Sequence, residues 1–123
     1  MKNKTTFNSQ PNYRKIVYAT VSLAVDGTKP MYWQVIKNGT LTGASYVDQD
    51  TANSIAQYDV SATVISAGSL VGGVVLGKTD NTRINLLDGD IVLRINPGET
   101  ITLAAKSINA TTVDLFLRWI EEI

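Results

Sequence analysis

Apolar and polar residues alternate along much of the chain, and this two-residue period is typical of half-buried β-strands. The alternation is clearest over residues 16–25, where Val17, Val21 and Val25 fall on one face of the expected strand. No window longer than a single turn holds the i, i+3, i+4 apolar stripe of a helix, and only residues 52–58 fit a short helical turn. The pattern therefore predicts an all-β protein.

Turn-forming residues divide this pattern into eight or nine expected strands, spaced about a dozen residues apart. The Asn-Gly pair at 38–39 predicts a type I′ hairpin turn that pairs residues 41–47 with residues 31–37. Asn-Pro-Gly at 96–98 predicts another turn, in which proline presets φ. The spacing favours an antiparallel β-sandwich of jelly-roll type, with an immunoglobulin-like sandwich as the alternative. The clearer strands are expected at residues 16–25, 31–37, 41–47, 60–66, 70–76, 83–87, 91–95, 101–105 and 112–120.

The last expected strand, residues 112–120, carries apolar side chains on both of its faces. Such a strand is either central in a covered sheet or lies at a subunit interface. A trimeric jelly roll would place this surface around its axis. The residues of the outward face that we expect to contact another subunit are Phe116, Arg118 and Ile120.

The first fifteen residues lack any periodicity and are unusually basic. They carry a charge of +4, because four basic residues precede the first acid, whereas residues 16–123 carry 7 basic and 11 acidic residues. We interpret residues 1–15 as an extended or disordered arm attached to a β-sandwich domain at 16–123. The arm is either a solvated tail or a segment that docks on an acidic partner. The candidate contact residues of the arm are Lys2, Lys4, Phe7, Tyr13 and Arg14.

Two absences limit the chemistry of this 123-residue chain, which contains no cysteine and no histidine. Thiol nucleophiles, thiolate metal sites and imidazole bases are therefore excluded. Asp48 with Asp50 and Asp88 with Asp90 are interpreted as turn residues, although paired loop carboxylates also suit calcium. We expect no enzyme activity, no catalytic or metal-binding residue and no cofactor. We also expect no nucleic-acid partner, because no basic stripe runs through the acidic domain.

The sequence of residues 72–79, GGVVLGKT, matches the pattern of a phosphate-binding loop. Such a loop needs a strand before it and a helix after it, but here its middle residues themselves resemble a strand. We interpret the match as coincidental. No apolar stretch is long enough for a signal peptide or a membrane span, so we expect synthesis in a cytoplasm and no membrane partner.

Several aromatic residues are candidates for stacking on sugars, which leaves glycan binding as a possible function. The alternative is that they form the core or an interface, as aromatic residues of small β-sandwiches usually do. The candidates are Tyr18, Tyr32, Trp33, Tyr46 and Tyr58.

The second half of the chain contains a recognisable series of segments. DVSATVISAG at residues 59–68 is followed by ITLAAKS at 101–107 and by TVDLFLRWIEE at 112–122. This order resembles small virion proteins of tailed bacteriophages, in which a Leu-Thr-Leu-x-Ala-Arg/Lys-Ser strand precedes a last strand ending in Trp-x-Glu. The resemblance covers about residues 55–123 and is a pattern of strands, not a catalytic signature.

The resemblance implies a capsid-associated accessory protein, such as a head decoration protein or a head-fibre component. It also allows a module of a tail fibre or baseplate. Such proteins are β-sandwiches, often trimeric, with an N-terminal arm that touches the shell. The expected function is therefore that of a structural protein of a virion assembled in the host cytoplasm, with the major capsid protein or another virion protein as its partner. The alternative is a carbohydrate-binding module that recognises a glycan on the host surface.

Overall fold

A computed structural model describes residues 1–25, 31–76, 83–85, 92–107 and 113–122. These residues form strands and loops, and no helix occurs among them. The strands are β1 (Lys2–Asn3), β2 (Thr6–Phe7), β3 (Gln10–Pro11), β4 (Val17–Val25), β5 (Met31–Lys37), β6 (Thr40–Thr42), β7 (Val47–Asp48), β8 (Ala56–Tyr58), β9 (Val64–Ser66), β10 (Ser69–Leu76), β11 (Arg83–Asn85), β12 (Leu93–Ile95), β13 (Ile101–Ser107) and β14 (Val113–Glu121).

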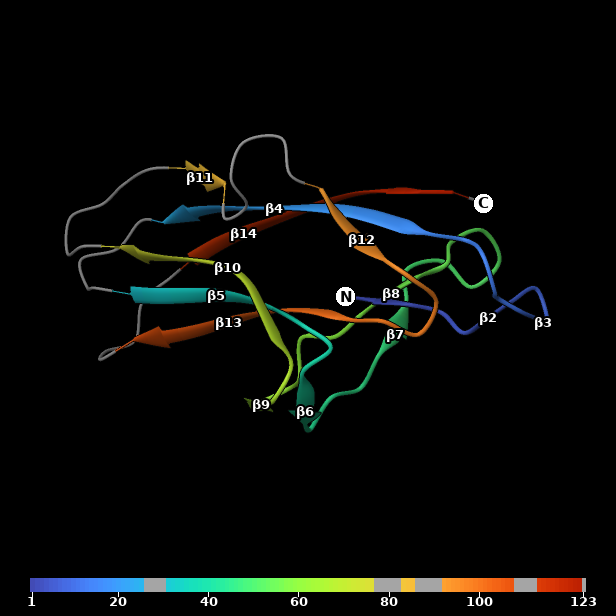
Figure 1. The fold of residues 1–123 in the computed structure, drawn as a ribbon, viewed down its shortest axis with the longest axis horizontal. Coiled ribbons are helices and arrows are strands. Elements are labelled where there is room, and N and C mark those ends of the chain that lie inside the picture. Colours follow the sequence, from blue (N-terminus) through green and yellow to red (C-terminus); the bar gives the residue numbers. More distant parts are fainter. Residues whose placement is uncertain (26–30, 77–82, 86–91, 108–112, 123) are drawn as a thin grey trace.

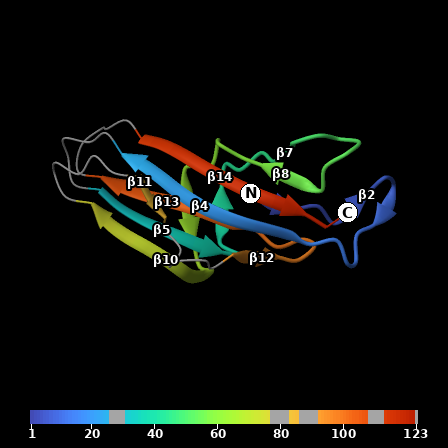
Figure 2. The ribbon, with the colours of Figure 1, turned by 90° about the horizontal axis from the view of Figure 1, so that it is seen from above.

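Two larger antiparallel sheets form the main layers, and each is organised around one central strand (Figure 1). In the first sheet, β14 pairs with β4 along its whole length, from Val113↔Val25 to Glu121↔Val17. Strands β11 and β12 pair with the opposite edge of β4. In the second sheet, β5 lies between β10 and β13. Figure 2 shows β4, β14 and β5 running along the length of the molecule, with the arrow of β4 opposite in direction to those of β14 and β5.

Both sheets contribute side chains to one buried core. The first sheet supplies Val17, Ala19 and Ile95, and the second supplies Trp33, Val35 and Ile101, while Ile55 comes from the loop before β8. Leu117 and Trp119 of β14 pack against this core, as expected for the inward face of the last strand. The all-β prediction is confirmed, and in the part of the chain described none of the antiparallel sheets is closed.

Residues 1–15 are folded into the domain, although the sequence suggested an extended or disordered arm. Strand β1 pairs with β8, and Lys2 also forms a bridge with Thr100. The side chain of Asn3 is fully buried, and Met1 packs against the core. The polar composition of residues 1–15 suggested a solvated arm. These residues form hydrogen bonds inside the protein instead, which allows their polar groups to be buried.

The turn at 38–39 differs from the predicted hairpin. Asn38 has the expected positive φ of 56°, but β5 pairs with β10 and β13, whereas β6 pairs with β9. The backbone of Asn38 instead donates to the carbonyl of Thr100 at 2.9 Å, and its Oδ1 accepts the Thr100 amide at 3.0 Å. These bonds continue the pairing of β5 with β13 by one residue, and beyond them the chain leaves the sheet, with β6 pairing with β9. The predicted strand at 41–47 is correspondingly split into β6 and β7, with Gly43 at φ 75° between them.

Two other local predictions can be compared directly with the structure. The turn at 96–98 is confirmed, because the Glu99 amide donates to the Asn96 carbonyl at 2.9 Å and Gly98 has a φ of 83°. Within the pattern of a phosphate-binding loop, residues 73–76 lie in β10 and pair with β5, so its middle residues form a strand as expected. Residues 77–79 of that pattern lie outside the described residues. The strand expected at residues 70–76 corresponds to β10, and Leu70 near its start is 62% exposed.

Candidate functional site

The exposed part of the N-terminal segment lies beside a basic residue from a distant strand. Tyr13 is 81% exposed and Arg14 is also exposed. Both line a shallow hollow together with Arg94 of β12 and with the turn residues Asn96 and Pro97. The guanidinium Nε of Arg94 donates to Asn96 Oδ1 at 3.0 Å, which fixes this side chain at the edge of the hollow. We refer to Tyr13, Arg14 and Arg94 as the basic hollow.

The other basic and aromatic candidates of the segment have partners within the protein. Lys4 is buried and forms an ion pair with Asp48 at 3.1 Å. The Lys2 ammonium lies 5.5 Å from the centre of the Tyr46 ring, a cation–π distance. Phe7 packs against the core. Much of the +4 charge of residues 1–15 is thus used internally, and only part of it is presented to solvent.

The last strand presents two of its three predicted contact residues to solvent. Arg118 is exposed and Ile120 is 73% exposed, on the face of β14 opposite to Leu117 and Trp119. Phe116 occupies a position opposite Ser22 in the register, and its side chain lies outside what the structure describes. Trp119 Nε1 donates to Glu121 Oε1 at 2.8 Å, and Glu121 also accepts the Ser54 hydroxyl and the Ile55 amide. These bonds attach the end of β14 to the loop before β8.

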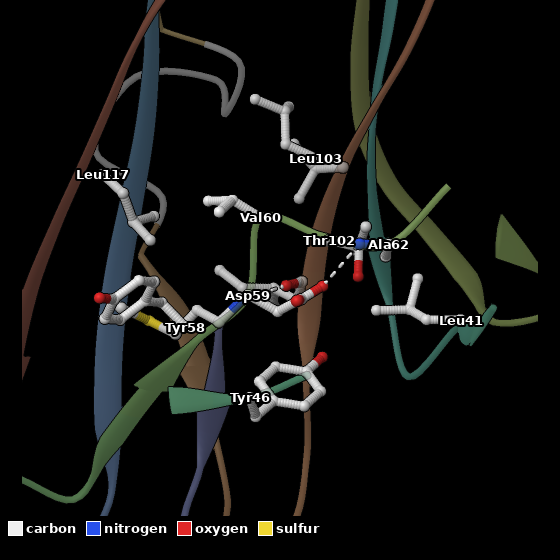
Figure 3. Close-up of a pocket in the computed structure, with 12 residues that line it drawn as sticks. Leu41, Tyr46, Tyr58, Asp59, Val60, Ala62, Thr102, Leu103 and Leu117 are labelled. Atoms are coloured by element: carbon white, nitrogen blue, oxygen red, sulfur yellow. Dashed lines mark hydrogen bonds between the residues drawn. The ribbon is translucent and has the colours of Figure 1, made fainter. Parts of the chain in front are cut away.

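A second hollow, of about 350 Å³, opens between the two main sheets (Figure 3). Leu117 of the first sheet and Leu103 of the second lie on opposite sides of it, with Val60 between them. Tyr46 and Tyr58 form part of its wall, and most of its other lining residues are apolar. The hollow offers apolar and aromatic contact area with few polar groups.

The single carboxylate of this hollow, Asp59, is engaged in holding the loop that forms its wall. Asp59 Oδ1 accepts the amides of Ser45 and Ser61, at 2.9 and 3.0 Å, and Oδ2 accepts the Ala62 amide at 3.1 Å. The Ser61 hydroxyl also donates to Oδ1. These hydrogen bonds, first those from Ser61 and Ser45, hold the pKa of Asp59 far below its ordinary value. Asp59 is therefore a loop anchor and remains ionised.

The other candidate carboxylates serve the same structural purpose. Asp50 accepts the Ala52 and Asn53 amides in a tight turn, which confirms the turn interpretation for this residue. The amide of Gln57 and the ammonium of Lys4 lower the pKa of Asp48. Residues 88 and 90 lie outside the described residues. Among the residues that the structure describes, no group of three or more His, Cys, Asp or Glu side chains is placed to hold a metal ion.

The aromatic candidates for sugar stacking are distributed between core and surface. Trp33 is only 8% exposed and belongs to the core, so it is not a stacking platform. Tyr32 and Tyr58 are more than 40% exposed, and Tyr58 and Tyr46 meet at the apolar hollow. Burial and the nearby Asp59 raise the pKa of the Tyr46 hydroxyl. Tyr46 and Tyr58 therefore share one exposed hollow, and Trp33 is not part of it.

Two important residues could not be recognised from the sequence. Arg94 joins the basic hollow although it is 80 residues from Arg14, a distance over which spacing carries no information. Asn3 is the most buried polar residue in the part of the chain that the structure describes, but its neighbours in the sequence have the polar composition of a solvated tail.

Comparison with protein-family models, curated proteins and solved structures finds no match. Function must therefore be inferred from the residues of this chain. No helix in the described ranges is long and apolar enough to cross a membrane.

Proposed function

We propose that this chain is a structural virion protein, which docks on a capsid or another virion protein and associates with further copies of itself. It would act in the assembled particle after synthesis in the host cytoplasm. The architecture that we propose is a jelly-roll β-sandwich, supported by two antiparallel sheets that share one core. The resemblance of residues 55–123 to small phage virion proteins supplies the biological context.

The basic hollow is the observation that carries the docking proposal. An exposed tyrosine and two arginines from distant parts of the chain meet on one surface. Tyr and Arg are the residue types most enriched in the energetic centres of protein interfaces. Glu99, which accepts the Asn96 amide nearby, is already paired with Lys37 at 3.0 Å. The arginines are therefore available for the carboxylates of an acidic partner.

The structural use of the carboxylates supports an assembly function. Asp48, Asp50, Asp59, Glu99 and Glu121 all accept hydrogen bonds from groups of the same chain. Each of these bonds attaches a loop or a strand end to its neighbour. General acid–base catalysis by a pair of carboxylates would require groups that face a substrate.

Deleting residues 1–14 would not test docking, because Asn3 and Asn12 are buried and hydrogen-bonded within the domain. The suitable changes are Arg14→Glu and Arg94→Glu, with Lys106→Glu at an exposed position of β13 as the matched control. Virus particles assembled with each variant are purified on a density gradient and probed with an antibody against the chain. We expect wild type and the control in the particle band, and at least about ten-fold less of either arginine variant.

Two results would contradict the proposal at different levels. If the wild-type chain is missing from purified particles, it is not a virion protein. If it is present and both arginine variants bind equally well, the virion assignment stands but the basic hollow is not the docking surface. Circular dichroism of each variant shows whether the fold is retained.

A second candidate function is glycan binding at the apolar hollow, favoured by the meeting of Tyr46 and Tyr58 on its wall. Aromatic faces of this kind stack on the apolar faces of sugar rings. A glycan array with the wild-type chain would then give reproducible hits that Tyr58→Ala removes and Tyr32→Ala, an exposed tyrosine on β5, leaves unchanged. An array without hits would exclude this function for the glycans displayed.

A further inference from the structure

Three alternate residues at the end of the last strand form an ordered stripe on the protein surface. Arg118, Ile120 and Glu122 are all exposed, and Ile120 is 73% exposed. The antiparallel pairing with β4 continues past the strand end, because the Glu122 amide donates to the Ile16 carbonyl at 2.9 Å. Successive side chains of a strand point to opposite faces, so these three share one face. We call them the β14 stripe.

The two residues between them point the other way. Trp119 packs against the core, and its Nε1 donates to Glu121. Glu121 accepts the Ser54 hydroxyl at 2.6 Å and the Ile55 amide at 2.8 Å. These contacts fix the orientation of the strand. The β14 stripe therefore faces solvent irrespective of the conformations of its own side chains. The stripe is thus presented on a rigid element.

The order of the stripe is basic, apolar and acidic, at positions i, i+2 and i+4. Two such strands placed antiparallel, with Ile120 opposite Ile120, bring Arg118 of each copy opposite Glu122 of the other. The pattern is self-complementary in this arrangement alone. A parallel arrangement would place Arg118 against Arg118 and Glu122 against Glu122, and like charges opposite each other destabilise strand pairs.

The described residues do not satisfy these charges within the chain. The ion pairs among them join Lys4 to Asp48 and Lys37 to Glu99, and neither involves the β14 stripe. A large aliphatic side chain between two complementary charges resembles the centre and rim of a small protein interface. Tyr18, which lies opposite Ile120 on β4 and is half-buried, extends the apolar surface beside it.

We propose that the β14 stripe binds the same stripe of a second copy across a two-fold axis that passes near Ile120. The inference rests on the proposed self-association and specifies its surface and symmetry. A two-fold axis makes an isologous interface, in which the same patch is used on both copies. Ile120 meets Ile120 near the axis, and Arg118 of each copy meets Glu122 of the other. The resemblance to phage proteins implied a trimer. A three-fold axis cannot place this stripe against the same stripe of another copy, so the assembly formed by this contact is a dimer.

Charge reversal tests the pairing directly. Arg118→Glu and Glu122→Arg each place like charges opposite one another, whereas the double variant restores two opposite pairs with their signs exchanged. We expect sedimentation equilibrium to give a dimer for wild type, dissociation constants raised about ten-fold or more in each single variant, and recovery in the double variant. Lys106→Glu on β13 is the control for a change of net charge alone. Failure of the double variant to recover would overturn the proposed register.

A cysteine crosslink tests the axis independently, because the chain contains no cysteine. Ile120→Cys places the two thiols close together across the axis and should form an intermolecular disulfide under mild oxidation. Val64→Cys on β9, at a site 58% exposed in wild type, should remain largely unlinked. Equal crosslinking of both variants, or none at Ile120→Cys, would overturn the inference.

These outcomes separate the two proposals. A wild-type trimer that does not crosslink through Ile120→Cys would refute the two-fold contact and leave self-association standing. A monomer at all concentrations would refute both the two-fold contact and the self-association.

Discussion

Asn3 offers the sharpest test of the fold, because its single polar side chain bonds to two other segments, residues 12–15 and the end of β12. Its side chain is completely buried. Nδ2 donates to the carbonyls of Lys15 and Ile95, at 2.8 and 2.9 Å, and Oδ1 accepts Asn12 Nδ2 at 3.1 Å. The substitution Asn3→Ala removes all three hydrogen bonds, so the buried groups that bonded to Asn3 lose this partner.

The size of the effect follows from these contacts. A neutral hydrogen bond within a protein contributes about 1 kcal/mol net, so three bonds correspond to about 3 kcal/mol of unfolding free energy. This is a large fraction of the roughly 5–15 kcal/mol that stabilises a typical domain. Urea unfolding followed by tryptophan fluorescence measures the loss. Gln10→Ala, at an exposed position of β3, is the control and should change the free energy by less than about 0.5 kcal/mol.

Asn3→Asp distinguishes hydrogen bonding from simple loss of volume. The ionised carboxylate that this substitution introduces would face two carbonyl oxygens without a proton to donate, so we expect a greater loss at neutral pH than for Asn3→Ala. Protonation restores one donor, so the pKa of the introduced carboxyl would rise and the defect should diminish in acid. A loss below about 1 kcal/mol in Asn3→Ala, or a defect in Asn3→Asp that does not depend on pH, would refute the reasoning.

Two further predictions concern an ion pair and a turn. The side-chain hydrogen bond from Gln57 and the pairing with Lys4 lower the pKa of Asp48, so both contacts stabilise the fold above the ordinary value of 3.8, and this stabilisation is lost as the pH falls through the lowered pKa. Unfolding free energies at about pH 5 and pH 2 should therefore differ less in Lys4→Met than in wild type; an unchanged difference would contradict this. Gly68→Ala should cost about 1–2 kcal/mol more than Gly43→Ala. Both glycines have positive φ, but a Cβ at Gly68 would lie 2.7 Å from Ile36 Cγ2, whereas at Gly43 the nearest atom is 3.7 Å away. Thermal or urea unfolding measures the difference, and equal losses would show that the contact is relieved.

Local chemistry explains which parts of the fold were predictable. Strand β5 coincides with the predicted residues 31–37, because its aromatic and β-branched residues favour a strand whatever its partners. The turn at 96–98 was equally predictable, because proline fixes its own φ and the following glycine accepts a positive φ. In both cases the structural preference is contained within a few adjacent residues.

Partner choice explains what the sequence missed. Asn38 adopts the predicted positive φ, but it bonds to Thr100, 62 residues away, and the next strand, β6, pairs with β9 instead of returning to β5. The burial of Asn3 depends likewise on Ile95, which lies 92 residues away. The basic hollow needs Arg94 beside Arg14. Such long-range pairs leave no trace in local composition or periodicity.

The central claim is that this chain functions through protein–protein association, first of all with further copies of itself. Native mass measurement of the unmodified 13.3 kDa chain over a range of concentrations tests it most directly. We predict a species of twice that mass that persists as the protein is concentrated and that dissociates in Arg118→Glu. A chain that remains at 13.3 kDa at the highest concentration would contradict the account.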